Sequence, residues 1–536
     1  MADMVNVRRT SGHSFRERPQ VRIGRSQFNR SHGLKTTFDA SYLYPILVDE
    51  VLPGDTFTLK MNGFCRIFSP LDAPIMDNIE VETFFFYIPT RLLWSNWEYF
   101  QGAHDAAGAQ DTDYTIPIMG AGLTVATVAG ASGAARLAAH LGLPEGLDSS
   151  NCEVSALPFR AYSRVWNEWF RDQNILPELT ENTGNGPDTV GNYVLKKRAK
   201  KHDYFTSCLP YLQKGEDVTI PFAGQAEIWY NQDVGGEPTI YLPDNDPGFG
   251  GPGYYRLDTD TTRLDVSATS GLANNVLYAE LSTVTGGFSI NALRQSVAIQ
   301  RLLETDARSG TRYTEILKAH FGVTAPDYRL QRPEYLGGGK SYINVSEVAN
   351  TSATATEDQG ELRGIGRGTI SGHGFAKSFV EHGYILGLIC ARGDLTYQKG
   401  VDRMWTRQTR YDFYMPALAN LGEQSVLNKE IYVSNVPATD DAVFGYQERW
   451  AEYRFAHSRL AGLFRSDAAG SLDFWHLSED FASLPALNST FIEDQTPMSR
   501  VTVVDTADDF ILDAWFDYKC ARPLPVFSVP SLTARF

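Results

Sequence analysis

The chain has 536 residues, of which 43% are hydrophobic and 12% aromatic, so it is long and apolar enough to bury a large globular core. Its formal net charge of −16 excludes a protein that coats nucleic acid by charge neutralisation over its whole surface. The five cysteines are an odd number without a CxxC pair, which argues against a disulfide framework or a zinc site and indicates reduced thiols.

Residues 1–39 form a basic N-terminal arm, and the first 35 of them carry a net charge of +6. We expect the arm to lie against nucleic acid or a neighbouring chain through Arg16, Arg18, Arg22 and Arg25. The arm lacks the apolar stretch of a signal peptide, and apolar runs elsewhere are shorter than the ~20 residues of a membrane helix. These features predict a soluble protein without membrane insertion.

Runs rich in Phe, Val, Thr and Ile, bounded by Pro, Gly or Ser, predict β-strands at distant places in the chain. They span residues 56–68, 79–88, 217–221, 372–391, 431–433 and 514–520. Pairing over such distances, with long connections, is typical of an antiparallel sandwich or jelly roll. The pattern alone predicts a mostly β fold with helical excursions, in a first part at 40–221 and a second part at 288–522.

Two aromatic stripes predict helices. Residues 159–170 place five aromatic side chains on one helical face, namely Phe159, Tyr162, Trp166, Trp169 and Phe170. A stripe near Tyr446 aligns Tyr446, Trp450, Tyr453 and His457. Such stripes usually belong to a core, and a contact between subunits is the alternative.

A dense basic cluster lies between these two stripes. Cations for a phosphate backbone and aromatic faces for bases occur together here, which favours contact with single-stranded DNA. The candidate contact residues are Lys196, Lys197, Arg198, Lys200, Lys201 and Tyr204. A solvated basic loop or a subunit salt-bridge patch is the alternative.

Residues 222–287 form an acidic, Gly-rich segment with nine acidic and two basic residues, which predicts a surface insertion. Oxygen ligands for a hard cation gather at Asp244, Asp246, Asp258 and Asp260, although the EF-hand spacing is absent and a solvated acidic loop is the simpler interpretation. We assign no metal site and no cofactor.

The segment after the insertion predicts two helices. Ser289 is placed to cap the first helix, whose broad apolar face includes Leu293, Val297, Ile299 and Leu302 and which ends near Gly310. In the second helix Tyr313, Ile316, Leu317 and His320 share one face, and Gly322 and Pro326 end it. The tail at 523–536 is expected to extend along another chain element or subunit through Val526, Phe527 and Phe536.

Signatures of catalysis are missing from the sequence. No HExxH, GxSxG or phosphate-binding loop occurs, and a GxGxxG match at Gly248 contains Pro252 and lacks the surrounding strand and helix. We therefore name no catalytic residues and predict that the chain is not an enzyme.

Long blocks of the chain resemble the major capsid protein of gokushoviruses, the small single-stranded DNA phages of the Microviridae. The blocks are FSINALRQSVAIQRLLETDARSGTRYTEILKAHFGVTAPDYRLQRPEYLGGG from Phe288, GRSQFNRSHGLKTTFDASYLYPILVDEVLPGDTF from Gly24, HDYFTSCLPYLQKGEDVTIP from His202, GYQERWAEYRFAHSRLAGLFR from Gly445 and RPLPVFSVPSLTARF at the end. The resemblance implies an eight-stranded antiparallel jelly roll with long loop insertions and several helical excursions.

The resemblance also implies a function and partners. The chain is expected to build a T=1 icosahedral shell around circular single-stranded DNA, with a small basic DNA-binding protein, a scaffolding protein and a pilot protein as partners. By its position, the insertion at 222–287 is the candidate for the protrusions at three-fold axes that the family is expected to use to meet a host surface receptor. The protein would then be found in the virion, assembled in the cytoplasm of the host bacterium. A β-sandwich lectin or glycoside hydrolase, with sugar bound at the acidic loop, is the alternative from another class.

Overall fold

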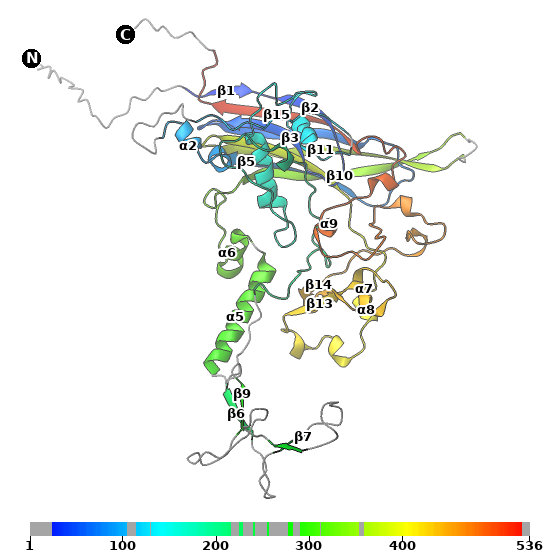
Figure 1. The fold of residues 1–536 in the computed structure, drawn as a ribbon. Coiled ribbons are helices and arrows are strands. Elements are labelled where there is room, and N and C mark those ends of the chain that lie inside the picture. The colour runs from blue at the N-terminus through cyan, green and yellow to red at the C-terminus, as the bar shows by residue number, and fades with distance from the viewer. Residues whose placement is uncertain are drawn as a thin grey trace, which may run out of the picture. The chain divides into compact units, whose positions relative to one another are not determined.

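The computed structural model describes residues 24–103, 114–128, 130–215, 224–228, 239–241, 254–256, 277–281, 290–310, 312–352 and 359–527. The chain divides into two compact units (Figure 1). One unit contains residues 213–310, and the other contains residues 1–212 and 311–536.

The larger unit is built on one curled antiparallel sheet (Figure 1). Its strand order is β1 (Ser26–Asn29), β15 (Phe510–Arg522), β4 (Thr56–Ile67), β11 (Leu362–Ser378), β10 (Glu334–Ala349), β5 (Ile79–Pro89), β12 (Gly383–Arg392) and β3 (Tyr44–Val51). A further strand, β2 (His32–Phe38), pairs with β15. The predicted fold class, a mostly β chain with an antiparallel jelly roll and helical excursions, is confirmed.

The sheet curls around an aromatic core. Strand β10 pairs with β5 along its first half and with β11 along its second half, which bends the sheet. In the interior the ring of Phe57 stacks on Tyr518 at 5.1 Å between centroids, and Phe85 lies 5.6 Å from Phe375. Each fully buried Phe of this kind contributes roughly 1.5–3 kcal/mol to folding.

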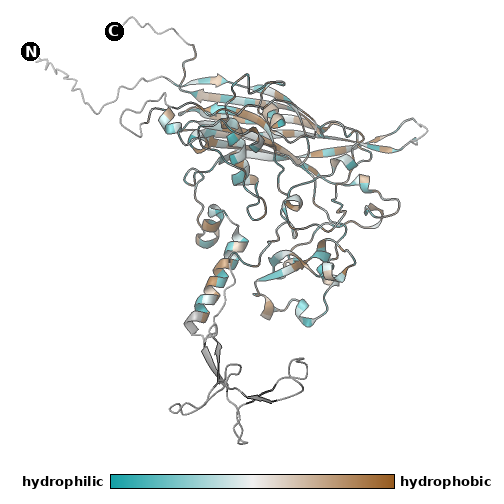
Figure 2. Cartoon of the chain, in the orientation of Figure 1, coloured by the Kyte–Doolittle hydropathy of each residue, from teal (hydrophilic) through white to brown (hydrophobic). Residues whose placement is uncertain are grey.

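The two faces of β4 explain why a period-2 pattern marks it in the sequence. Phe57, Leu59 and Met61 are buried, while the alternating Thr58 and Lys60 are exposed. Figure 2 accordingly shows hydrophobic and hydrophilic residues together along the strands of the sheet. One face of this part of the sheet therefore packs on the core and the other faces solvent.

Strands β5 and β12 are buried on both faces, which explains their long apolar runs. On the face of β5 that points away from the interior, Phe84 contacts Phe170 at 5.2 Å and Phe86 contacts Trp169 at 5.5 Å. These partners belong to the predicted helix at 159–170. It is observed as α4 (Leu157–Val165) followed by a π-helical turn (Trp166–Phe170), and its aromatic stripe is core.

The other helices of this unit are short. They are α1 (Thr90–Leu93), α2 (Trp97–Phe100), α3 (Ala134–His140), α6 (Tyr313–Phe321), α7 (Asn428–Ile431), α8 (Pro437–Asp440) and α9 (Ser489–Ile492). Gly322 ends α6 with a φ of 67°, as its position in the sequence predicts. Among the helices in the described ranges, none combines the length and apolar composition that crossing a membrane requires. All five cysteines are free of disulfide bonds.

Three predicted elements are wrong. The helix near Tyr446 is instead strand β14 (Val443–Glu448), which pairs with β13 (Glu423–Leu427) and is followed by a 3₁₀ turn. The predicted strand at 431–433 is not observed, because Ile431 is the last residue of α7 and the next two residues belong to no strand. The run at 372–391 is not one strand, because it contains the end of β11, a connection and most of β12.

The smaller unit contains α5 (Ile290–Ser309) and two pairs of short strands. Strand β6 (Gly224–Ile228) pairs with β9 (Leu277–Leu281), and β7 (Thr239–Tyr241) pairs with β8 (Tyr254–Arg256). The helix confirms the prediction from the sequence, but its apolar side chains Leu293, Val297, Ile299 and Leu302 are 37–60% exposed. The predicted strand at 217–221, the cap Ser289 and the acidic cation candidates Asp244, Asp246, Asp258 and Asp260 lie outside the described residues.

A buried cluster of aspartate side chains lies at the start of β15. The side chain of Arg136 is fully buried and lies 2.8 Å from carboxylate oxygens of both Asp39 and Asp508. The neighbouring Asp509 accepts a hydrogen bond from the Ala40 N–H at 2.9 Å. Burial, reinforced by the nearby carboxylates, raises the pKa of Asp509 from 3.8 to about 6.

This raised pKa leads to a prediction for stability against pH. Between about pH 4 and pH 6 the folded chain keeps a proton on Asp509 that the unfolded chain has released, so stability falls as the pH rises. We expect Asp509→Asn to raise the free energy of unfolding above pH 6 by up to about 3 kcal/mol, at ~1.4 kcal/mol per pKa unit. Urea unfolding at a series of pH values measures this effect. The exposed Asp513→Asn is the control, and equal pH profiles for the two variants would refute the assignment.

Candidate nucleic-acid interface and subunit-contact surface

The basic segment 196–204 is extended and held on both sides. Backbone hydrogen bonds of 2.8 to 3.0 Å join it to residues 41–43 on one side and to residues 492–494 on the other. Its backbone is therefore fixed between the residues before β3 and the end of α9. Whether each charge is paired or free depends on where its side chain points.

Arg198 points toward β5 and is neutralised there. Its guanidinium forms an ion pair with Glu82 and lies 4.7 Å from the ring centroid of Phe84. Arg392 donates to the same carboxylate at 2.7 Å. Burial acts to raise the pKa of Glu82, but the two guanidinium groups outweigh it and lower that pKa.

Lys200 and Lys201 are also paired inside the chain. The Lys200 side chain is 2% exposed, and its Nζ donates to Glu479 at 2.7 Å. The Nζ of Lys201 lies 2.8 Å from a carboxylate oxygen of Glu80. Both positive charges are thus balanced by carboxylates of the same subunit.

Lys196 and Lys197 differ from their neighbours. Both are half-buried, and each Nζ lies over an aromatic ring, at 5.6 Å from the centroid of Trp166 and 5.3 Å from that of Tyr42. Among the residues that the structure describes, neither forms an ion pair with a carboxylate. DNA contact thus stays a prediction for these two lysines, whereas the geometry of the other candidates favours a salt-bridge patch within one subunit.

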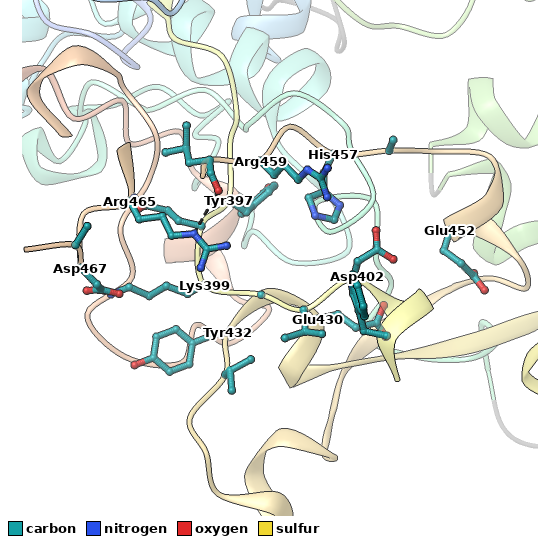
Figure 3. Close-up of a pocket in the computed structure, with 18 of the residues that line it drawn as sticks. Tyr397, Lys399, Asp402, Glu430, Tyr432, Glu452, His457, Arg459, Arg465 and Asp467 are labelled. Atoms are coloured by element: carbon teal, nitrogen blue, oxygen red, sulfur yellow. Dashed lines mark hydrogen bonds and ion pairs between the residues drawn. The ribbon is translucent and has the colours of Figure 1, made fainter. Parts of the chain in front are cut away.

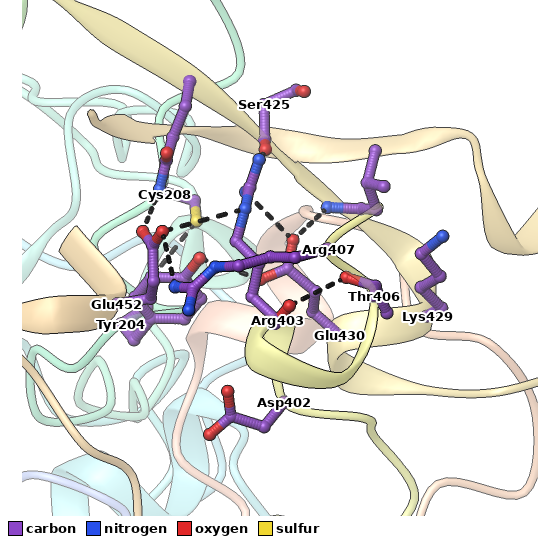
Figure 4. A network of polar contacts seen from close by, with 12 residues as sticks. Tyr204, Cys208, Asp402, Arg403, Thr406, Arg407, Ser425, Lys429, Glu430 and Glu452 are labelled. Carbon is purple, nitrogen blue, oxygen red and sulfur yellow. Dashed lines mark hydrogen bonds and ion pairs between the residues drawn. The ribbon is translucent and has the colours of Figure 1, made fainter. Parts of the chain in front are cut away.

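Tyr204, the last candidate, belongs to a polar network that the sequence did not predict (Figure 4). Its hydroxyl donates to Glu430 at 2.8 Å, and Arg403 lies 3.2 Å from the same carboxylate. Arg407 pairs with Glu452 at 3.4 Å. Burial raises the pKa of Glu430, although Arg403 opposes the shift. The network ties the basic segment to the loop that precedes β13.

A cavity of about 1350 Å³ opens next to this network (Figure 3). Its lining combines aromatic rings with charges of both signs, among them Tyr397, Lys399, Trp405, Tyr432, His457 and Asp467. No group of His, Cys, Asp and Glu side chains within the described ranges is arranged to hold a metal ion. The lining comes from separate loops without a shared motif, so no sequence signal reveals it.

Exposed aromatic and aliphatic side chains occur in the loops around residues 404–455, and two of them, Trp405 and Phe455, line the cavity. The exposed side chains are Met404, Trp405, Tyr411, Phe413, Tyr414, Leu421, Tyr453 and Phe455, and we call them the 404–455 aromatic surface. Trp405 is 74% exposed and Tyr411 71% exposed. The guanidinium of Arg407 joins two members, at 5.5 Å from the ring centroid of Phe413 and 4.4 Å from that of Tyr453. Exposed apolar surface of this kind is typical of protein contacts.

The two chain ends are only partly described. Arg25 lies on the sheet, where its Nη2 donates to Thr56 Oγ1 at 2.5 Å and to the carbonyl of Ala521 at 3.0 Å. In the tail, Val526 is 61% exposed and Phe527 79% exposed, and their contact with another subunit stays a prediction. The remaining predicted residues of these ends, Arg16, Arg18, Arg22 and Phe536, lie outside the described residues.

Comparison with known proteins identifies close relatives. Residues 17–532 match the family described as capsid protein (F protein). The chain is 45% identical to capsid protein VP1 of Bdellovibrio phage phiMH2K, over 98% of this chain and 99% of the relative. It is 41% identical to capsid protein VP1 of Chlamydia phage 1 and 32% identical to that of Spiroplasma virus 4, with 97% of both chains covered in each case.

Proposed function

The chain belongs to the capsid protein (F protein) family of Microviridae-type phages, and we propose that it closes into a T=1 icosahedral shell around a circular single-stranded DNA genome. The family is structural, so the protein acts by assembly and not by catalytic turnover. Its place is the virion, and we propose that assembly takes place in the cytoplasm of the host bacterium.

The 404–455 aromatic surface is the observation that carries the proposal. These exposed side chains lie outside the buried core of the chain. Trp and Tyr residues with more than half of their surface exposed supply the anchors that dominate the affinity of protein interfaces. A shell repeats each interface by symmetry, so even a modest contact stabilises the closed particle many times over.

The unit at 213–310 supports a second role, attachment to the host. It contains the acidic insertion 222–287, and α5 in the same unit exposes Leu293, Val297 and Leu302. An exposed apolar helix face suits contact with other copies at a symmetry axis, and a polar insertion suits a solvent-facing tip. We therefore propose that this unit forms the three-fold protrusion and meets the host surface receptor.

The charge balance supports the proposed partners. A subunit of net charge −16 cannot neutralise a packaged genome by itself, so a small basic DNA-binding protein is expected inside the shell. A scaffolding protein and a pilot protein of the phage complete the proposed set. Within this chain the proposed inner contacts are Lys196, Lys197 and the basic arm, and the proposed subunit-contact tail contains Val526, Phe527 and Phe536.

Nuclease protection tests the proposed function. Cells that express this chain with its neighbouring phage genes are lysed, treated with nuclease and fractionated on a density gradient. We expect this chain to be the main protein of a fast-sedimenting fraction that also holds circular single-stranded DNA. A uniform small oligomer without protected DNA would contradict the proposal and favour a sugar-binding β-sandwich protein.

A further inference from the structure

One half of the curled sheet has an open outer face. On the β5 side, the outer face is covered by the basic segment and by the helix at 157–170. On the side formed by β15, β4, β11 and β10, the outward side chains alternate with buried ones and are exposed to solvent. We call these outward side chains the open sheet face.

Two arginines stand directly opposite each other on the open sheet face. Arg66 of β4 pairs in register with Arg367 of β11, and both are exposed. Side chains opposite each other in an antiparallel pair project from the same face with Cβ atoms ~4.5–5.5 Å apart, and like charges there are destabilising. In the described part of the chain, neither guanidinium has a carboxylate within ion-pair distance. The fold therefore keeps a repulsive cationic pair that an anion would relieve.

Aromatic side chains flank this pair on the same face. Phe64 lies two residues from Arg66 along β4, and Tyr342 lies two residues from Asn344, which is opposite Arg367. Trp515 is opposite Asn62 on β4. Its indole also lies beside Gly33, because a Cβ added to that glycine would be 3.5 Å from the ring. The three rings are 41%, 51% and 54% exposed. Flat rings beside exposed cations form a platform for stacked bases.

The charge balance of the open sheet face also favours an anionic partner. The strands and their neighbour β2 add Lys35, Lys60, Lys340 and Lys519 to the two arginines, against Asp513 and Asp517 as outward acids. Lys340 is paired with Glu80 and Lys519 with Asp517, so the arginine pair remains the uncompensated centre. A locally cationic face on a chain of net charge −16 is complementary to a polyanion.

We infer that the open sheet face binds the single-stranded DNA genome, with Arg66 and Arg367 on backbone phosphates and Phe64, Tyr342 and Trp515 against bases. The planar guanidinium of arginine suits phosphate oxygens and also stacks on rings. This inference rests on the proposed function, because it identifies the surface of the subunit that meets the enclosed genome. It places the principal contact on the sheet and not on the basic segment, most of whose charge is neutralised internally.

The test compares DNA binding by full-length chain taken from unassembled gradient fractions. A fluorescein-labelled oligo-dT is titrated with each variant over a range of salt concentrations, and affinity is read from anisotropy. We expect Arg66→Gln/Arg367→Gln to weaken binding roughly tenfold at low salt. The slope of log affinity against log salt should fall by about 1.4, since each contact to a single-strand phosphate contributes about 0.7. Arg66→Lys/Arg367→Lys, which keeps both charges, should retain the slope.

A matched control removes two exposed cations elsewhere. Lys318→Gln/Arg329→Gln should leave affinity and slope unchanged. An equal slope for this control and for Arg66→Gln/Arg367→Gln would overturn the inference. So would loss of particles by the arginine variant with normal DNA binding, because the face would then contact a second copy. Either result would refute only the inference, as long as the wild-type chain forms particles with protected DNA. If the wild-type chain forms no such particles, the proposed function itself is refuted.

Discussion

Replacing Asp188 with alanine is expected to lower the free energy of unfolding by about 3–5 kcal/mol, because it leaves a buried arginine without its counter-charge. Arg160 donates to Asp188 through Nε at 2.8 Å and through Nη2 at 2.7 Å, and the two side chains are 3% and 1% exposed. The hydroxyl of Tyr193 donates to the same carboxylate. Urea unfolding of the unassembled chain measures the loss.

Two further variants separate the buried pair from an ordinary surface pair. Glu381→Ala breaks an ion pair with Arg91 in which the Glu381 side chain is 45% exposed and the Arg91 side chain 26% exposed. This variant should lower the free energy of unfolding by less than about 1 kcal/mol. Arg160→Met/Asp188→Leu removes both charges and should recover part of the stability lost in Asp188→Ala. Equal losses for Asp188→Ala and Glu381→Ala would show that burial of the pair does not matter.

The second large effect is expected on assembly. Trp405→Ser/Tyr411→Ser removes the two most exposed rings of the 404–455 aromatic surface, and we expect particles to be lost while the melting temperature stays unchanged. Interface anchors of this kind typically contribute about 2 kcal/mol or more each, and a closed shell repeats the loss at every copy. The fraction of chain that sediments as particles measures the outcome.

The control for this variant is Tyr313→Ser/Tyr328→Ser. These tyrosines are 64% and 61% exposed and lie outside the 404–455 aromatic surface. They should leave more particles than the first variant does. Normal particle yield from Trp405→Ser/Tyr411→Ser would remove the aromatic surface from the set of subunit contacts.

Elements with a local cause were predictable from the sequence. Strand β4 shows its alternation of buried and exposed residues directly, and α6 ends at Gly322, where the backbone takes a φ of 67°. The aromatic residues at 159–170 have helical spacing, and the observed helix packs Trp169 and Phe170 on β5. The order of strands in the sheet could not be predicted from the pattern, because it depends on pairing between distant segments such as β4 and β15.

Elements decided by distant partners were mispredicted. The aromatic spacing near Tyr446 fits a helix, but Tyr446 instead pairs with Ser425 in a two-stranded sheet, and Trp450 takes a positive φ of 68° that a helix cannot contain. In the run 372–391, Gly372 has a φ of 73° at an irregularity of β11, and the chain then turns before β12. Neither the pairing nor the turn is encoded in the local pattern.

The basic cluster shows the same limit for a functional site. Its composition matches a DNA-binding segment, yet Arg198, Lys200 and Lys201 meet Glu82, Glu479 and Glu80, which are distant in sequence. The arginine pair on the open sheet face was equally invisible, because Arg66 and Arg367 become neighbours only through the register of β4 and β11. A charged residue in the sequence is therefore available to bind a ligand only if the fold leaves it without a partner of opposite charge.

A reconstruction of the nuclease-resistant particles by cryo-electron microscopy tests the central claim most directly. The expected result is a closed icosahedral shell with one copy of this chain in each asymmetric unit. A neighbouring copy should cover the 404–455 aromatic surface, and density for single-stranded DNA should lie against Arg66 and Arg367. A small oligomer without a closed shell would contradict the claim that this chain builds the capsid around the genome.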